Sequence, residues 1–208
     1  DQVNNIIADD RVQGVALTGS ERAGQLIAAE AGKNMKQSSL ELGGSDPFIV
    51  LEDADLSEIK KIIGGARLYN AGQVCTSSKR FIVTEKNYDA LLDMLKEAFS
   101  EAKIGDPMDS DTTLAPLSTS KAKQNLTKQV KAAGDAGATL AFGSVEQNLP
   151  AAQFEPVILT NITKENPAFY QEFFGPVGQV YKVKDEEEAI ALANDSHYGL
   201  SGVVFGGS

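Results

Sequence analysis

Short β-prone segments and amphipathic helices alternate along this chain, and the alternation constrains the fold more than any other feature of the sequence. Strands separated by helices are typical of βαβ units. We therefore predict an α/β fold with a mostly parallel, doubly wound sheet. The predicted strands span residues 15–18, 40–42, 48–51, 80–84, 139–142, 156–160 and 177–183. The predicted helices span 2–9, 22–31, 55–66, 88–102, 120–133 and 185–194, and the pair Asn166–Pro167 has the pattern of a further helix start.

The two ends of the sequence and one double glycine indicate how the chain is organised. The first residue, Asp1, is not a methionine and leads directly into a predicted helix, while an apolar run at 202–205 lies close to the last residue. We therefore expect a fragment of a longer protein. The pair Gly43–Gly44 can absorb a change of backbone direction, so we expect a domain boundary there, between residues 1–43 and 44–208.

Composition excludes several classes of function. The chain has one cysteine, Cys75, and one histidine, His197, so an intrachain disulfide and a metal site rich in cysteine or histidine are excluded. The formal net charge is −10, which argues against nucleic-acid or anionic-membrane partners. We found no apolar run near the roughly 20 residues of a membrane span and no signal peptide, so we expect a cytoplasmic protein.

Cys75 is the first candidate for chemistry. It follows Gly72, Gln73 and Val74 in a polar stretch between a predicted helix and a predicted strand. A thiolate there could attack a carbonyl carbon. Taken alone, a single cysteine is more often an inert buried residue, but these polar neighbours do not resemble a protein core. His197 lies in a turn-like segment and is a poor candidate for the partner base.

Glu41 is the alternative base. It stands between Leu40 and Leu42 and before the double glycine. Burial of a carboxylate disfavours its charged form and makes it a better base for activating water. The competing interpretation is that the strand alternates and that Glu41 faces solvent.

Two further segments could bind a nucleotide. Gly19 and Ser20 join a strand to a helix that contains Gly24, and the first N–H groups of that helix could hold a phosphate, although an ordinary capped turn is the more frequent case. In the segment 171–177, Glu172 could accept hydrogen bonds from ribose hydroxyls and Phe174 could lie beside a planar ring. Core packing followed by a turn is the alternative for this segment.

In this order, the four segments resemble the aldehyde dehydrogenase superfamily. Leu40–Gly44 is similar to the family's glutamate motif, 72–75 to its cysteine motif, 171–177 to its E-x-F-G-P segment, and 193–201 to its late N-x-x-x-Y-G-L stretch. Residues 72–81 and 193–196 are most similar to bacterial succinate-semialdehyde dehydrogenases.

The resemblance implies a role for each candidate residue and NAD or NADP as cofactor. Cys75 would be the nucleophile, and Glu41 would activate the water that hydrolyses the thioester. The implied cofactor contacts are Gly19, Ser20 and Gly24 at the pyrophosphate, Leu42 near the carboxamide, Glu172 at the nicotinamide ribose and Phe174 beside the ring. Some relatives have a substrate-binding arginine where Tyr69 stands here, and some have a second cysteine at the position of Ser77, so we expect no redox switch. No metal is implied.

The resemblance also implies what the chain covers. Residues 1–43 would be the last βα part of the NAD(P)-binding domain, and 44–208 a catalytic domain that stops before the oligomerisation segment of a homo-oligomer. The implied reaction is oxidation of a small aldehyde, with succinic semialdehyde as the best candidate. Two alternatives stay open: a CoA-acylating enzyme, which Glu41 argues against, and a fragment without activity of its own.

Overall fold

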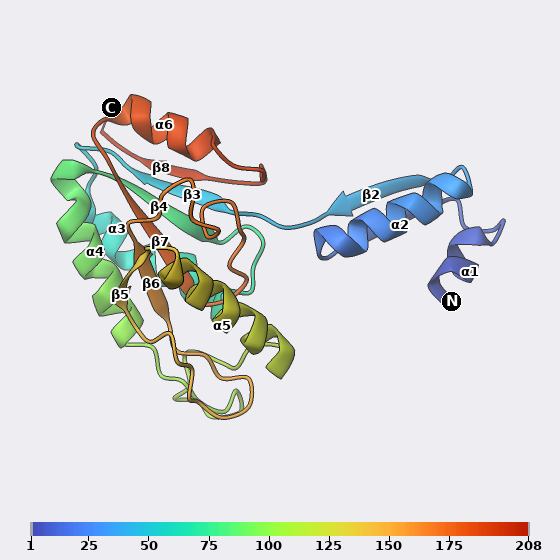
Figure 1. Ribbon diagram of the computed structural model, residues 1–208, viewed down its shortest axis with the longest axis horizontal. Coiled ribbons are helices and arrows are strands. Elements are labelled where there is room, and N and C mark those ends of the chain that lie inside the picture. The colour runs from blue at the N-terminus through green and yellow to red at the C-terminus, as the bar shows by residue number, and fades with distance from the viewer. Residues whose placement is uncertain (1, 208) are drawn as a thin grey trace. The chain divides into compact units, whose positions relative to one another are not determined.

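The computed structural model describes residues 2–207, which form two compact units that meet between Gly43 and Gly44. Each unit is described by itself below, with the element labels of Figure 1. Among residues 2–207, we found no helix with both the length and the apolar character that a membrane span requires.

The first unit is a βαβ arrangement preceded by a short helix. Its elements are α1 (Gln2–Ala8), β1 (Gly14–Thr18), α2 (Glu21–Lys33) and β2 (Gln37–Glu41). Strands β1 and β2 pair in parallel, with Thr18 opposite Glu41. Ser20 is the N-cap of α2, as its position predicts, and accepts a hydrogen bond from the Ala23 N–H at 3.3 Å.

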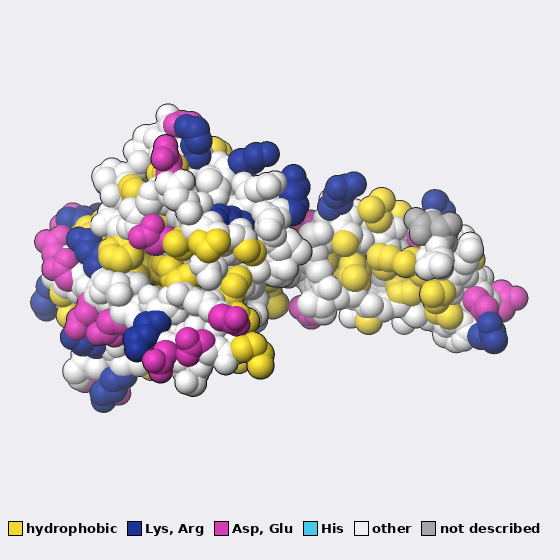
Figure 2. All heavy atoms as spheres, turned by 90° about the horizontal axis from the view of Figure 1, so that it is seen from below, with side chains coloured by type: hydrophobic (Ala, Val, Ile, Leu, Met, Phe, Trp, Pro, Cys, Tyr) yellow, Lys and Arg dark blue, Asp and Glu magenta, His cyan; other side chains and the backbone are white. Residues whose placement is uncertain are grey.

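This first unit leaves apolar side chains in contact with solvent. Val3, Ile6 and Leu26 are 49%, 61% and 64% exposed. Figure 2 shows hydrophobic side chains grouped over its surface. A sheet of only two strands covers little apolar surface, which leaves these side chains exposed within the unit.

The second unit contains a six-stranded sheet in the order β5-β6-β7-β4-β3-β8. Only β5 and β6 pair antiparallel, so the sheet is mixed and mostly parallel. The strands are β3 (Asp46–Val50), β4 (Ser78–Thr84), β5 (Thr139–Phe142), β6 (Val157–Thr160), β7 (Val177–Val183) and β8 (Val203–Phe205). The helices are α3 (Leu56–Leu68), α4 (Glu85–Ser100), α5 (Ser120–Asp135) and α6 (Glu186–Asn194), with the short 3-10 helix η1 (Tyr69–Gly72).

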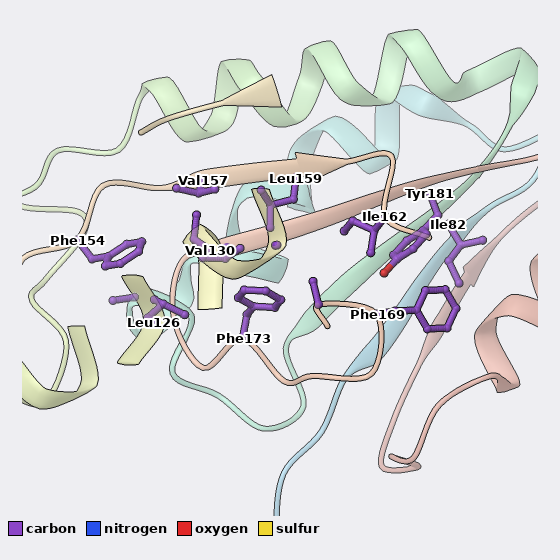
Figure 3. Packing of buried hydrophobic residues seen from close by; sticks show 14 of the residues in the cluster. Ile82, Leu126, Val130, Phe154, Val157, Leu159, Ile162, Phe169, Phe173 and Tyr181 are labelled. Atoms are coloured by element: carbon purple, nitrogen blue, oxygen red, sulfur yellow. The ribbon is translucent and has the colours of Figure 1, made fainter. Parts of the chain in front are cut away.

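Helices cover both faces of this sheet. Because successive strand residues point to opposite faces, Phe81 and Val83 pack in one cluster with α3 and α4, while Ile82 packs in the other. The second cluster includes Leu126 and Val130 of α5, Ala189 of α6 and Phe173 from the loop before β7 (Figure 3). The predicted α/β class with a mostly parallel, doubly wound sheet is therefore confirmed.

The predicted helix after Asn166–Pro167 is wrong. These residues form turns. The Asn166 side chain accepts the Ala168 N–H at 2.9 Å, as an N-cap would, but its Nδ2 donates to the carbonyl oxygens of Ala133 at 2.9 Å and Ala136 at 3.3 Å. Asn166 is 3% exposed. It closes the C-terminal end of α5 rather than beginning another helix, because the last carbonyls of a helix need donors.

Candidate active site

Three of the segments predicted from the sequence lie together at the amino ends of neighbouring strands in the larger sheet. Gly44 lies two residues before β3, Cys75 three residues before β4, and Phe174 three residues before β7. These three strands are neighbours and run parallel, so their amino ends lie together. Ligands in open α/β sheets usually bind at the carboxyl ends of strands. The candidate site of this chain lies instead at the amino ends of its strands.

The loop that carries Cys75 begins with an unusual backbone conformation. Asn70, Ala71 and Gly72 have φ angles of 51°, 54° and 72°, so three consecutive residues are left-handed. This conformation costs free energy at non-glycine residues. Asn70 and Gln73 hold it by exchanging side-chain hydrogen bonds to each other's carbonyl oxygens at 3.1 and 3.2 Å. Cys75 follows this turn and is partly exposed.

Two glycines allow the backbone segments of the site to approach closely. A Cβ atom on Gly72 would collide with the carbonyl oxygen of Gly175, and one on Gly44 would collide with the carbonyl oxygen of Cys75. The first contact joins the cysteine loop to the segment before β7, and the second joins it to the segment before β3. No other residue fits these two positions without a shift of backbone.

Arg67, at the end of α3, connects the cysteine loop to the segment before β7. Its side chain is fully buried. Its five donors reach four backbone carbonyl oxygens and one hydroxyl: Nε donates to Val177 at 2.6 Å, Nη1 to Gly72 at 3.2 Å and to the Ser77 Oγ at 2.8 Å, and Nη2 to Phe173 at 2.6 Å and to Gly175. Burial lowers the pKa of Arg67, and the charge of Glu172 opposes that shift. The arginine therefore serves as an internal brace.

Lys79, the second residue of β4, is a second fully buried cation beside the same loop. Its Nζ donates to the carbonyl oxygens of Val74 at 2.8 Å, Cys75 at 2.9 Å and Ser77 at 3.2 Å. The carboxylate of Glu172 lies 3.4 Å from the same Nζ. Burial and, secondly, the charge of Arg67 lower the pKa of Lys79 to about 8, while Glu172 and Asp46 act in the opposite direction.

Glu172 and the two phenylalanines that follow it have different environments. The Oε1 of Glu172 is buried and makes no hydrogen bond within residues 2–207. Phe173 is fully buried in the core, whereas Phe174 is 47% exposed. Glu172 and Phe174 thus flank a core residue, and each presents a group that the core does not use: a carboxylate oxygen without a hydrogen bond and an exposed ring.

Other polar side chains near the cysteine form hydrogen bonds within the protein. The guanidinium group of Arg80 donates to the carbonyl oxygens of Ser45 at 2.7 Å, Leu192 at 2.9 Å and Ala193 at 2.8 Å. The Ser77 hydroxyl accepts from Arg67 and donates to Val74 at 3.1 Å. Neither Arg67 nor Arg80 presents its guanidinium group to solvent, since they are 0% and 3% exposed. His197 is exposed and stacks on Tyr170.

The candidate residues of the first unit lie where its strands end. The Gly19 N–H donates to the carbonyl oxygen of Glu41 at 2.9 Å, and the Glu41 side chain is exposed. A Cβ on Gly24 would lie 2.7 Å from the Leu42 Cδ2. Gly24 therefore lets α2 pack closely against Leu42. Among the described residues, we found no group of three or more side chains that could bind a metal.

The sequence interpretation missed the roles of Arg67 and Lys79, although the sequence contains a signal for each. Arg67 follows Ile59 and Ile63 at intervals of four, which places it on the buried face of α3. Lys79 lies two residues before the buried Phe81, on the same face of β4, and every residue of this strand is buried. A cation at an apolar position beside the only cysteine indicates an internal anchor.

The larger unit is thus an α/β domain in which a partly exposed thiol lies on a loop held by two buried cations, at the amino ends of neighbouring parallel strands. The family model described as "Aldehyde dehydrogenase family" matches residues 1–208. The chain belongs to the aldehyde dehydrogenase family, which confirms the resemblance seen in the motifs.

The chain is similar to bacterial succinate-semialdehyde dehydrogenases. It is 47% identical over 203 residues to the NADP(+) enzyme of Deinococcus radiodurans, covering 98% of this chain and 43% of that protein. It is 42% identical over 205 residues to the NAD(P)+ enzyme of Escherichia coli, covering 99% of this chain and 44% of that protein. The crystal structure of succinic semialdehyde dehydrogenase from Streptococcus pyogenes in complex with NADP+ matches with a TM-score of 0.97 and 56% identity, covering 100% of this chain and 46% of that one. The chain spans less than half the length of these relatives.

Proposed function

We propose that the protein carrying these residues is an NAD(P)-dependent aldehyde dehydrogenase that oxidises succinic semialdehyde to the carboxylate. Residues 1–43 would complete the cofactor-binding domain, and 44–208 would form most of the catalytic domain. The observation that carries the proposal is the position of Cys75: its partly exposed thiol lies on a loop that Arg67 and Lys79 connect to the segment of Glu172 and Phe174.

The residues of the chain support the steps of this reaction. The deprotonated Cys75 Sγ adds to the aldehyde carbon and forms a thiohemiacetal. The bound cofactor supplies the hydride acceptor that allows this adduct to become a thioester. Glu41 then takes a proton from water, whose oxygen attacks the thioester carbon, releases the acid and restores the thiol. A glutamate base meets the needs of the hydrolytic step without a metal or a histidine.

The described residues fit a dinucleotide. The buried Oε1 of Glu172 is an acceptor that makes no hydrogen bond inside residues 2–207, which suits a ribose hydroxyl, and the exposed ring of Phe174 suits a planar heterocycle. In the first unit, Gly19, Ser20 and the start of α2 are proposed for the pyrophosphate, and the Leu42 backbone for the carboxamide. Gly24 supports this turn by its close packing on Leu42. Either NAD or NADP meets these requirements.

The substrate assignment rests on the relatives, which are named as succinate-semialdehyde dehydrogenases. Binding the carboxylate end of such a substrate calls for a cation. Arg67 and Arg80 donate to backbone carbonyl oxygens from buried positions, so neither supplies the carboxylate's cation. Tyr69, where some relatives have an arginine, is 74% exposed. We propose that a residue other than Arg67, Arg80 and Tyr69 supplies the cation that binds the substrate carboxylate.

A panel of aldehydes tests the proposal. The full-length protein is incubated with each aldehyde and with NAD or NADP, and the absorbance of the reduced cofactor is followed. We expect the highest kcat/KM for succinic semialdehyde without added CoA. Turnover only in the presence of CoA would replace the hydrolytic reaction by an acylating one, and absence of turnover with every aldehyde would refute the proposal.

We further propose that the full-length protein is a cytoplasmic homo-oligomer. Light scattering of the purified full-length protein tests the proposed assembly.

A further inference from the structure

The contacts of Lys79 connect two proposed functional residues that belong to different loops. Its ammonium group has three N–H donors. All three reach carbonyl oxygens of the cysteine loop, at Val74, Cys75 and Ser77. Glu172 is held by its charge, since the Nζ to Oε1 distance is 3.4 Å and this oxygen makes no hydrogen bond inside the described residues. Lys79 thus contacts the cysteine loop through directional hydrogen bonds and Glu172 through an ion pair.

The charge state of Lys79 depends on its contact with Glu172. Arg67 is a second buried cation close enough to disfavour the charged form of Lys79, and the carboxylates of Glu172 and Asp46 favour it. A buried cation that loses its counter-charge tends to become neutral. A neutral amine has two N–H donors instead of three. A change in the charge of Glu172 would therefore reach the carbonyl oxygen of Cys75 as a lost or weakened hydrogen bond.

We propose that Lys79 is a positioning residue that couples the state of Glu172 to the position of Cys75. Its three hydrogen bonds hold the loop so that Cys75 stays partly covered, and Glu172 keeps Lys79 in the form that makes all three. The inference deepens the proposed function, because a cofactor that engages Glu172 would act on the thiol through Lys79. The contacts themselves are present without cofactor or substrate.

Alkylation of Cys75 by iodoacetamide tests the coupling directly. The chain has one cysteine, so the rate reports on that thiol alone. Rates are measured on the 208-residue chain, without cofactor or aldehyde, for four forms: the unchanged chain, Lys79→Met, Glu172→Gln and the double variant. We expect Lys79→Met to raise the rate at least about threefold, because the loop loses three anchors, and Glu172→Gln to raise it by a smaller factor. In the Lys79→Met background, Glu172→Gln should then have no further effect.

A pH series separates positioning from bulk structure. At each pH, the Lys79→Met rate is divided by the rate of the unchanged chain. The ratio should decrease between pH 7 and 9, because Lys79 loses its charge in this range and the unchanged loop comes to resemble the variant. A purely structural role of the side chain would leave the ratio constant. Lys79→Arg keeps its charge and donors whatever the state of Glu172, so it should keep the loop anchored but lose the response to Glu172→Gln.

Controls keep the outcome decisive. Lys131→Met and Asp135→Asn remove an exposed ion pair on α5 and should leave the alkylation rate unchanged. Thermal melting shows which variants fold. If Lys79→Met does not fold, the test rests on Lys79→Arg, in which Glu172→Gln should no longer change the alkylation rate; an unchanged response there would overturn the inference. Independent, multiplying effects of the two substitutions, or unchanged rates, would overturn the inference. Because the assay uses no cofactor, its failure leaves the proposed dehydrogenase activity standing, and absence of that activity leaves the coupling standing.

Discussion

The Nε of Arg67 donates to the carbonyl oxygen of Val177 at 2.6 Å, across 110 residues of sequence. This bond joins the end of α3 to the first residue of β7. It also fixes the path of the chain just before β7, where Phe174 and Glu172 lie. The site is thus assembled by a donor that contacts no reacting atom.

We expect Arg67→Met to lower the free energy of unfolding by about 3 kcal/mol or more, because several buried acceptors lose their donors and each unsatisfied group costs about 1–3 kcal/mol. Arg67→Lys should recover only part of this loss, since a lysine cannot reproduce the planar fork of five donors. Urea denaturation of the chain measures both. A loss below about 1 kcal/mol for Arg67→Met would contradict the role of brace.

The fold was predictable because its evidence is repeated along the chain, whereas the braces of the site were not. Periodic apolar positions such as Leu91, Leu95 and Phe99 specify a buried helix face, and many such positions agree. Asn166 has the pattern of an N-cap, but the carbonyls it meets belong to a helix about 30 residues earlier. Likewise, nothing local to Arg67 shows that Val177 needs a donor. Contacts between distant segments decide these roles, and periodicity does not encode them.

We expect the stability of the chain to depend on pH through Lys79. Its folded-state pKa is about 8, below the ordinary value of 10.5, because of burial and the charge of Arg67. Below pH 8 both states bind the proton and the folded state bears the full cost of a buried charge. As the pH rises above 8, the folded state releases the proton before the unfolded state does, so the free energy of unfolding increases.

The comparison with Lys79→Met isolates this contribution. Between pH 7 and 10, the free energy of unfolding of the unchanged chain should rise by about 2 kcal/mol relative to the variant. Urea titrations at several pH values measure the difference, in which groups common to both chains, such as Tyr181, cancel. A difference that stays constant with pH would show that Lys79 keeps its charge throughout this range.

We expect Gly72→Ala to damage the cysteine loop more than Gly65→Ala. Gly72 has a φ of +72°, and a Cβ there would meet the carbonyl oxygen of Gly175. Gly65 lies inside α3, and a Cβ there would have no heavy atom within 4 Å. Gly72→Ala should lower the free energy of unfolding by about 2 kcal/mol or more, while Gly65→Ala should be neutral or stabilising. Thermal melting of both variants checks this, and equal effects would contradict the close approach.

In the full-length protein, we expect Cys75→Ala to abolish aldehyde oxidation, because the proposed covalent adduct forms on this thiol. Glu41→Gln should keep a burst of reduced cofactor and slow the steady state at least about tenfold, since general-base catalysis contributes that much or more. Stopped-flow absorbance separates the burst from turnover. A Glu41→Gln protein with an unimpaired steady-state rate would remove Glu41 from the mechanism.

The neighbours Phe173 and Phe174 form a matched pair for the cofactor assignment. Phe173 is fully buried in the core, so Phe173→Ala should lower the free energy of unfolding by about 3–5 kcal/mol. Phe174 is 47% exposed, so Phe174→Ala should cost less than about 1 kcal/mol. If the Phe174 ring packs beside the nicotinamide, the same variant of the full-length protein should raise the KM for the cofactor severalfold, because the ring contact is lost. Melting curves and cofactor titrations separate the two effects, and an unchanged KM in Phe174→Ala would place the cofactor ring elsewhere.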